Sequence, residues 1–169
     1  MKNASIAFMG LIVLTALTLG GCSSAKDSNK FASAAAQGGM AEVQLGQLAA
    51  QHAADPAVKE FGLRMVADHS RAGNELKSIA SRKNLQLPAD ISSDQKSMVD
   101  KLSKLNGADF DKEYMSDMVK DHQEDADEFK TQAEGGSDAD IKAFAAKTLP
   151  MIQSHLQMAQ DVAKKVGAK

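Results

Sequence analysis

The sequence MVADHS at residues 65–70 returns, with two changes, as MVKDHQ at residues 118–123. The chain contains only four histidines, so a Met-Val-x-Asp-His pattern that uses two of them is a specific feature. Residues four apart lie on the same face of an α-helix. The methionine and the histidine of each copy therefore share one face. The repeat predicts two helices that each direct one histidine into the protein interior.

The surrounding sequence is rich in Ala, Leu, Lys, Gln and Met, which favours helices throughout. Capping and breaking residues predict four long helices and a short one. The long helices are expected at about 29–53, 56–83, 108–134 and 138–166, and the short one within 92–105. Two tight connections flank one long connection. This spacing favours an all-α fold, a ferritin-like four-helix bundle of two antiparallel hairpins joined by a long crossover that carries the short extra helix.

One histidine interrupts an otherwise apolar stripe near the middle of three of these helices, namely His69, His122 and His155. The first helix has Glu42 at the corresponding position. At a rise of about 1.5 Å per residue, these four residues lie within about one helical pitch of each other in depth. His52 lies close to the first turn and is not expected to join them.

Three imidazoles and a carboxylate inside a bundle form a candidate site for one divalent transition-metal ion, with Zn, Fe and Cu as the candidates. We therefore predict Glu42, His69, His122 and His155 as metal ligands. The alternative is that the histidines are hydrogen-bonded core residues. Asp68 and Asp121 point away from their neighbouring histidines, and we expect them to face solvent. The alternative for these two is an outer-shell contact to a ligand on another helix.

Methionine also precedes histidine by four residues in three places, at Met65, Met118 and Met151. Thioethers beside imidazoles are suitable soft ligands for copper, so a periplasmic copper-binding protein is an alternative function. The more ordinary interpretation is that these methionines fill gaps in the core. A third alternative is a metal-free structural or interaction module, with the polar stretch DHQEDADE at 121–128 as a docking surface or a solvated face.

The beginning of the chain predicts export and lipidation. An apolar stretch from Ala4 to Leu19 leads into LGGC at 19–22, which is typical of a bacterial lipoprotein signal. We expect a signal peptide at 1–21, a lipidated Cys22 with a polar tether over 22–29, and the helical domain over 30–167. Serines at 23 and 24 favour the outer membrane, with the protein facing the periplasm. The predicted membrane contact is the lipid anchor at Cys22.

The composition excludes several other classes. Cys22 is the only cysteine, so disulfides and thiolate metal sites are excluded from the mature domain. The formal net charge is −2 and there is no Trp, so we expect no nucleic-acid partner. No nucleophile or phosphate-binding motif is present in the sequence. No particular protein partner is indicated.

Four stretches carry a family resemblance, GGMAEVQLGQLA (38–49), DPAVKEFGLRMVADHS (55–70), FDKEYMSDMVKDHQ (110–123) and LPMIQSHLQMA (149–159). With them, residues 30–165 resemble the bacterial family known as domain of unknown function 4142. The resemblance implies a ferritin-like fold, with Glu42, His69, His122 and His155 as recurring polar positions. It implies no established activity.

The sequence departs from the ferritin-like enzymes that hold two irons. Those sites use Glu-x-x-His on two helices to supply bridging carboxylates. The residues three positions before the central histidines are Val66, Val119 and Ile152. We therefore expect no di-iron oxidase site, and no enzymatic activity is indicated.

Overall fold

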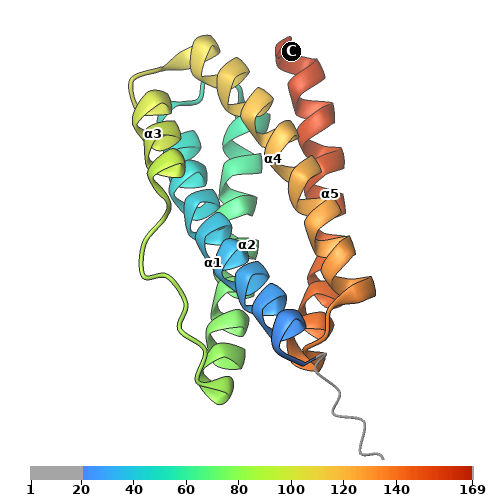
Figure 1. Ribbon diagram of the computed structural model, residues 1–169. Coiled ribbons are helices and arrows are strands. Elements are labelled where there is room, and N and C mark those ends of the chain that lie inside the picture. The colour runs from blue at the N-terminus through green and yellow to red at the C-terminus, as the bar shows by residue number, and fades with distance from the viewer. Residues whose placement is uncertain (1–20, 169) are drawn as a thin grey trace, which may run out of the picture.

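The computed structural model describes residues 21–168, and side chains from residue 26 onward. This part of the chain is all-helical and contains five helices and no strand (Figure 1). The helices are α1 (Gly21–His52), α2 (Pro56–Lys83), α3 (Ser93–Leu102), α4 (Gly107–Gly135) and α5 (Ala139–Val166). The predicted signal peptide lies outside the described residues except for Gly21, and the side chain of Cys22 is not described either.

Capping residues explain most of the helix boundaries. Asp55 caps α2 by accepting a hydrogen bond from the Ala57 amide at 2.7 Å, with Pro56 in the first turn. Asn84 ends α2 in the left-handed conformation, at φ 52°. In α3, Ser92 and Gln95 form a capping box. The expected bounds of α2 are therefore confirmed to the residue, and those of the other helices after α1 lie close to the expected ones.

The first helix begins eight residues earlier than expected, at Gly21 instead of 29, so the segment predicted as a polar tether is helical. Ser28 gives part of the reason, because its side chain is buried against the α4–α5 connection. Its hydroxyl accepts hydrogen bonds from Gln132 Nε2 at 3.2 Å and from the Asp138 amide at 3.4 Å. Tertiary contacts thus extend the helix beyond the point where apolar periodicity begins.

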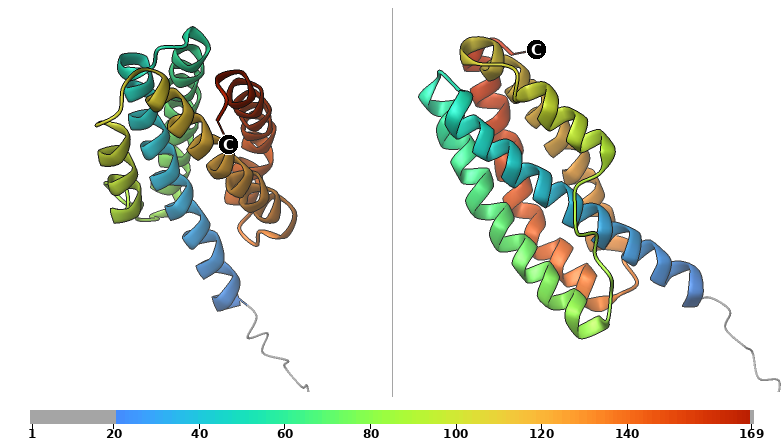
Figure 2. Two further views of the ribbon diagram at one scale, coloured as in Figure 1. Left: turned by 90° about the horizontal axis from the view of Figure 1, so that it is seen from above. Right: turned by 90° about the vertical axis from the view of Figure 1, so that its left-hand side faces the viewer.

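The four long helices form two hairpins, α1 with α2 and α4 with α5, which pack against each other (Figures 1 and 2). The long connection between the hairpins passes along the outside of α1, where α3 packs (Figure 2). At one end, Asp111 of α4 accepts hydrogen bonds from the amides of Ala54 at 3.1 Å and Asp55 at 2.8 Å. The turn between α1 and α2 is therefore fastened to the second hairpin.

The helices of the first hairpin cross at two glycines. A Cβ atom added to Gly46 would lie 2.4 Å from the carbonyl oxygen of Gly62, and one added to Gly62 would lie 2.5 Å from Cβ of Ala49. Only residues without a side chain allow the backbones to approach this closely. The crossing lies between the helix turn and the middle of the bundle, and it fixes the relative rotation of α1 and α2.

Two apolar clusters fill the bundle, and each long helix contributes to both. The cluster near the α1–α2 turn includes Leu45, Phe61, Met65, Tyr114, Met118 and Ala159. The cluster at the opposite end includes Phe31, Leu76, Phe129, Phe144 and Ile152. On every long helix, one central polar residue lies between the residues that the helix contributes to one cluster and those that it contributes to the other. The core is therefore divided by one buried polar layer formed by Glu42, His69, His122 and His155.

No helix among the described residues is long and apolar enough to cross a membrane.

Candidate metal centre

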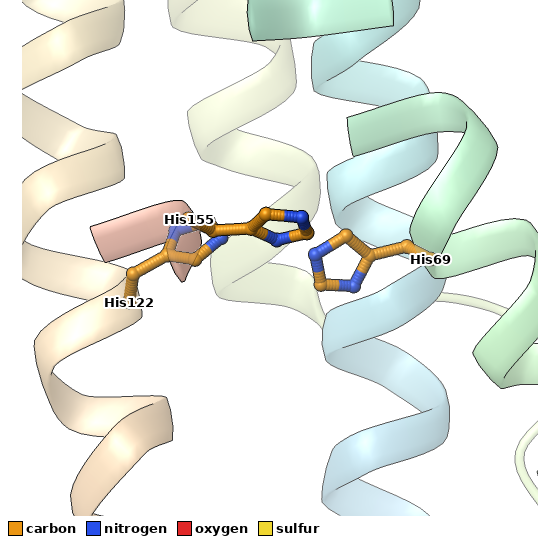
Figure 3. A group of neighbouring side chains, drawn as sticks. All are labelled: His69, His122 and His155. Atoms are coloured by element: carbon orange, nitrogen blue, oxygen red, sulfur yellow. The ribbon is translucent and has the colours of Figure 1, made fainter. Parts of the chain in front are cut away.

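Three helices each place one histidine in the middle of the bundle. His69 comes from α2, His122 from α4 and His155 from α5, and one ring nitrogen of each lies within 4.8 Å of the others (Figure 3). His122 and His155 are fully buried, and His69 is 6% exposed. The rings pack with centroids 5.4–5.8 Å apart. The helical periodicity thus predicts this convergence correctly.

The ring nitrogens divide into partnered and unpartnered atoms. Nδ1 of His122 donates to the carbonyl oxygen of Met118 at 3.0 Å, and Nε2 of His155 donates to Oδ2 of Asp68 at 3.0 Å. The remaining nitrogens of these rings, together with Nε2 of His69, are buried without a hydrogen-bond partner among the described residues. A buried unpaired polar atom costs about 1–3 kcal/mol, so three together constitute an unusual feature that calls for a ligand.

The expectation that Asp68 faces solvent is wrong, and Asp121 is half-buried beside Glu42. The Asp68 carboxylate is buried between α2 and α5, where it also accepts hydrogen bonds from Arg64 and from Arg71 at 3.2 Å. Burial raises the pKa of Asp68, but the hydrogen bonds from Arg64 and His155 outweigh it, so that the pKa lies below its ordinary value. Asp68 is therefore an ionised partner that fixes the tautomer and orientation of His155.

The same position in the second copy of the repeat has a different environment. Arg64 and Arg71 stand four residues before and three residues after Asp68, whereas Asp117 and Glu124 occupy these offsets around Asp121. The first aspartate is surrounded by guanidinium groups and the second by carboxyl groups. The two aspartates of the repeat therefore have neighbours of opposite charge.

Burial keeps the central histidines neutral. It lowers the pKa of His69 to about 3, aided by the neighbouring rings of His122 and His155. Burial and His155 lower the pKa of His122 to about 4, against the opposing effect of the Met118 carbonyl. Burial also lowers the pKa of His155, with the Asp68 hydrogen bond acting in the opposite direction. At neutral pH each ring therefore carries one lone pair that a metal ion can use without displacing a proton.

Glu42 is fully buried beside the histidines but is not a member of the converging group. Its Oε1 lies 3.8 Å from Nδ1 of His122, the nitrogen that already donates to Met118. Neither oxygen of Glu42 has a hydrogen-bond donor among the described residues. Burial raises its pKa well above the ordinary value, and a close contact with the carboxyl group of Asp121 and the charges of Asp121 and Asp125 raise the pKa further. The carboxyl thus lies next to the site without pointing at its centre.

Two further side chains of α4, Asp125 and Tyr114, also have raised pKa values. Burial raises the pKa of Asp125 to about 8, with the charge of Asp121 as the next cause. The Tyr114 hydroxyl is buried without a partner, and burial together with Glu42 raises its pKa. Sequence reasoning missed both residues. Tyr114 lies one turn before Met118 on the inner face of α4, and this spacing is the signal that could have identified it.

The three methionines that precede the histidines lie in apolar surroundings. Met65 and Met118 are fully buried in the cluster near the α1–α2 turn, and Met151 is half-buried against the other cluster. Their packing is that of ordinary core residues. His52 is also structural, because its ring stacks on Phe110 with centroids 5.7 Å apart and its Nδ1 lies 2.8 Å from the Leu105 carbonyl oxygen.

Residues 20–162 match the family model described as domain of unknown function (DUF4142), and the chain belongs to this family. Comparison with curated protein sequences finds no match.

Two solved structures from another family have a similar fold. One is a DUF305 protein from Streptomyces coelicolor, assigned as secreted, with a TM-score of 0.72 and 15% identity over 85% of this chain and 94% of that one. The other is a DUF305 fragment from Deinococcus radiodurans, with a TM-score of 0.71 and 12% identity over 82% of this chain and 96% of that one. At these identities the likeness concerns the fold alone.

Proposed function

We propose that this protein is a metal-binding protein of the cell envelope that holds one divalent transition-metal ion between Nε2 of His69, Nε2 of His122 and Nδ1 of His155. Two observations carry the proposal: one ring nitrogen of each histidine lies within 4.8 Å of the others, and each ring has one buried nitrogen without a hydrogen-bond partner among the described residues. A tetrahedral ion with metal–nitrogen bonds of about 2.0–2.1 Å holds its ligands roughly 3.3 Å apart. Small side-chain movements bring the three nitrogens to that spacing.

The donor set indicates which ions fit. Three imidazoles without a thiolate suit zinc, iron and copper, and the general affinity order places copper(II) above zinc and iron(II). Asp68 and the Met118 carbonyl supply the outer hydrogen bonds that metal-bound histidines ordinarily make. Glu42 is a buried carboxyl group whose Oε1 lies 3.8 Å from His122 Nδ1. We propose it as the fourth ligand, which binds after losing the proton that burial favours and after rotating away from His122 Nδ1.

The fold and the beginning of the chain complete the proposal. Two antiparallel hairpins joined by a long connection support a ferritin-like four-helix bundle, in which such inward-facing sites are common. The LGGC sequence supports lipidation of Cys22 after removal of residues 1–21, and Ser23 and Ser24 support anchoring to the outer membrane on the periplasmic side. The structural neighbour assigned as secreted agrees with a location outside the cytoplasm. Incorporation of labelled palmitate that is lost in Cys22→Ala would test the anchor.

The metal site is tested by metal content. The chain from Gly21 to Lys169 with Cys22→Ser includes every described helix, and it would be purified without a histidine tag and loaded separately with Zn, Fe and Cu. We expect about one equivalent of metal by plasma mass spectrometry, lost in His69→Ala and in His122→Ala. His52→Gln is the matched control, since His52 lies outside the cluster, and it should retain the metal. Failure of every loading to leave bound metal would overturn the proposal.

A further inference from the structure

A pocket of about 430 Å³ lies next to the metal centre, between α1, α2 and the connection that follows α2. Its wall includes His69 and Gly39, and its outer side is formed by residues 87–90. Gln37 of α1 donates to the carbonyl oxygen of Asp90 at 3.3 Å and so fastens the connection across the pocket. The volume is within the range of about 300–1,000 Å³ that is typical of small-molecule sites.

His69 is the only central histidine that lines this pocket. Its Nε2 is buried and points toward the other two rings (Figure 3). A Cβ atom added to Gly39 would lie 4.0 Å from Nδ1 of His69, so the missing side chain at residue 39 leaves the approach to this nitrogen open. The pocket therefore leads to the outer nitrogen of His69 and not directly to the centre of the site.

The three rings differ in what their second nitrogen contacts. His122 uses the Met118 carbonyl and His155 uses the Asp68 carboxylate, whereas the described residues provide no such partner for Nδ1 of His69. A metal ion on Nε2 fixes the proton on Nδ1, which makes this nitrogen a hydrogen-bond donor. The donor faces the pocket, so its acceptor has to come from whatever occupies the pocket.

We propose that the pocket binds a small carboxylate with a short apolar body, whose carboxylate accepts the hydrogen bond from Nδ1–H of His69. This inference rests on the proposed metal function, since the metal fixes the donor and adds positive charge behind it. Lys77 contributes a cation at the wall, and Gln44, Ser70 and Asn74 contribute polar groups. The carboxylate of Asp90 also lines the pocket, but Lys96 lies 3.6 Å from it and offsets its charge.

The apolar part of the wall accommodates the body of the ligand. Met40 and Val43 of α1 face Leu87 and Pro88 of the connection across the pocket. The ligand would place its carboxylate at the polar end near His69 and its hydrocarbon body against the apolar wall near the connection. Occupancy then links the two sites, because an acceptor on Nδ1 makes Nε2 a stronger metal ligand and the bound metal in turn favours the acceptor.

The test uses benzoate as the carboxylate probe and benzyl alcohol as its neutral analogue. Both would be titrated into zinc-loaded and zinc-free protein, and binding would be followed by NMR shifts of the backbone amides of Gly39, Gly73 and Leu87 and of the His69 ring nitrogens. We expect benzoate to bind the zinc-loaded protein at least tenfold more tightly than benzyl alcohol, and to shift His69 Nδ1. Removal of zinc should weaken benzoate binding severalfold, and Lys77→Met should weaken benzoate binding more than alcohol binding.

Two variants at adjacent glycines provide the matched comparison. Leucine at residue 39 fills the approach to His69, whereas a Cβ at Gly38 meets nothing within 4 Å. Gly39→Leu should abolish benzoate binding and retain zinc, and Gly38→Leu should retain both. Equal affinity for the two probes, or benzoate binding that survives Gly39→Leu, would overturn the pocket proposal while leaving the metal site intact. If zinc does not bind at all, the proposed function fails, and so does this inference.

Discussion

Nε2 of His155 on α5 donates a hydrogen bond to Oδ2 of Asp68 on α2, and the two atoms lie 3.0 Å apart. The bond crosses between the two hairpins, so it contributes both to packing and to the orientation of one candidate ligand. Arg64 and Arg71 hold the carboxylate from the solvent side. A fixed, ionised acceptor keeps the proton on Nε2 of His155 and directs the lone pair of Nδ1 toward the other histidines.

Asp68→Asn should therefore weaken metal binding. The amide retains the size of the carboxylate but lacks its charge, and loss of such outer partners typically costs about tenfold to a hundredfold in metal affinity. Competition with a chromophoric zinc chelator would measure the change. Asp127→Asn is the control, because Asp127 is an exposed carboxylate on α4 outside the histidine cluster, and it should leave the affinity unchanged. Equal effects of the two substitutions would contradict this role of Asp68.

Glu42→Leu should stabilise the metal-free protein and weaken metal binding at the same time. The buried carboxyl has no hydrogen-bond donor among the described residues, and an apolar group of similar size removes a cost of about 1–3 kcal/mol. Urea unfolding of the chelator-treated protein would measure the free energy of unfolding, and chelator competition the metal affinity. Glu42→Gln remains polar and should not give the gain in stability. A less stable Glu42→Leu variant would show that the carboxyl has a structural partner.

The copper alternative makes a different prediction for the methionines. Met65 and Met118 are fully buried in an apolar cluster, so we expect Met65→Leu and Met118→Leu to leave the affinity for copper(I) within about threefold of the wild-type value. Competition with a copper(I)-specific chelator would measure it, with His122→Ala as the control that should lose binding. A loss of tenfold or more in the leucine variants would favour thioether ligation and therefore copper handling.

The metal-free protein should lose stability as the pH falls from about 6.5 toward 4. The pKa values of His69 and His122 are about 3 and about 4 in the folded state, whereas an unfolded histidine has a pKa of about 6.5. Between these values the unfolded chain binds more protons, so stability rises with pH in this window and is fully present above it. Each histidine contributes a slope of about 1.4 kcal/mol per pH unit.

Other buried groups oppose this slope. Burial raises the pKa values of Glu42, Asp117 and Asp125, and these carboxyl groups favour the folded state at lower pH. The comparison should therefore be made between the wild type and His69→Leu, with urea unfolding at pH 7, 6 and 5. The variant should have a shallower dependence on pH, by about 1 kcal/mol per unit. The same slope in both proteins would mean that His69 takes up its proton while folded.

The sequence was sufficient to predict the convergence of the three histidines, because helical periodicity and depth along the helix depend only on spacing. It was not sufficient for their partners. Asp68 is adjacent to His69 but bonds to His155, which depends on the rotation of α2 against α5. Glu42 was correctly placed in the interior, but its position beside the partnered nitrogen of His122 depends on side-chain rotamers.

The pocket beside His69 could not be anticipated for a related reason. Its outer wall is the connection at residues 87–90, whose path along α1 is set by tertiary contacts such as the hydrogen bond between Gln37 and Asp90. Connections lack the periodicity that identifies the faces of a helix. The sequence shows Gly39 as a glycine within a helix, but only the structure shows that it lies opposite His69.

The close crossing of α1 and α2 leads to a prediction about stability that is independent of any ligand. Gly62→Ala places a Cβ atom 2.5 Å from Cβ of Ala49 and 2.9 Å from the Gly46 carbonyl oxygen, so the helices must separate. We expect a loss of about 1–3 kcal/mol in the free energy of unfolding, because overpacking at a backbone contact cannot be relieved by a side-chain rotation. Gly73→Ala in the same helix meets nothing within 4 Å and should be neutral or stabilising by up to about 1 kcal/mol, since alanine is the better helix former. Urea unfolding of both metal-free variants would measure the difference, and a Gly62→Ala protein as stable as Gly73→Ala would mean that the hairpin is looser at this crossing than the structure indicates.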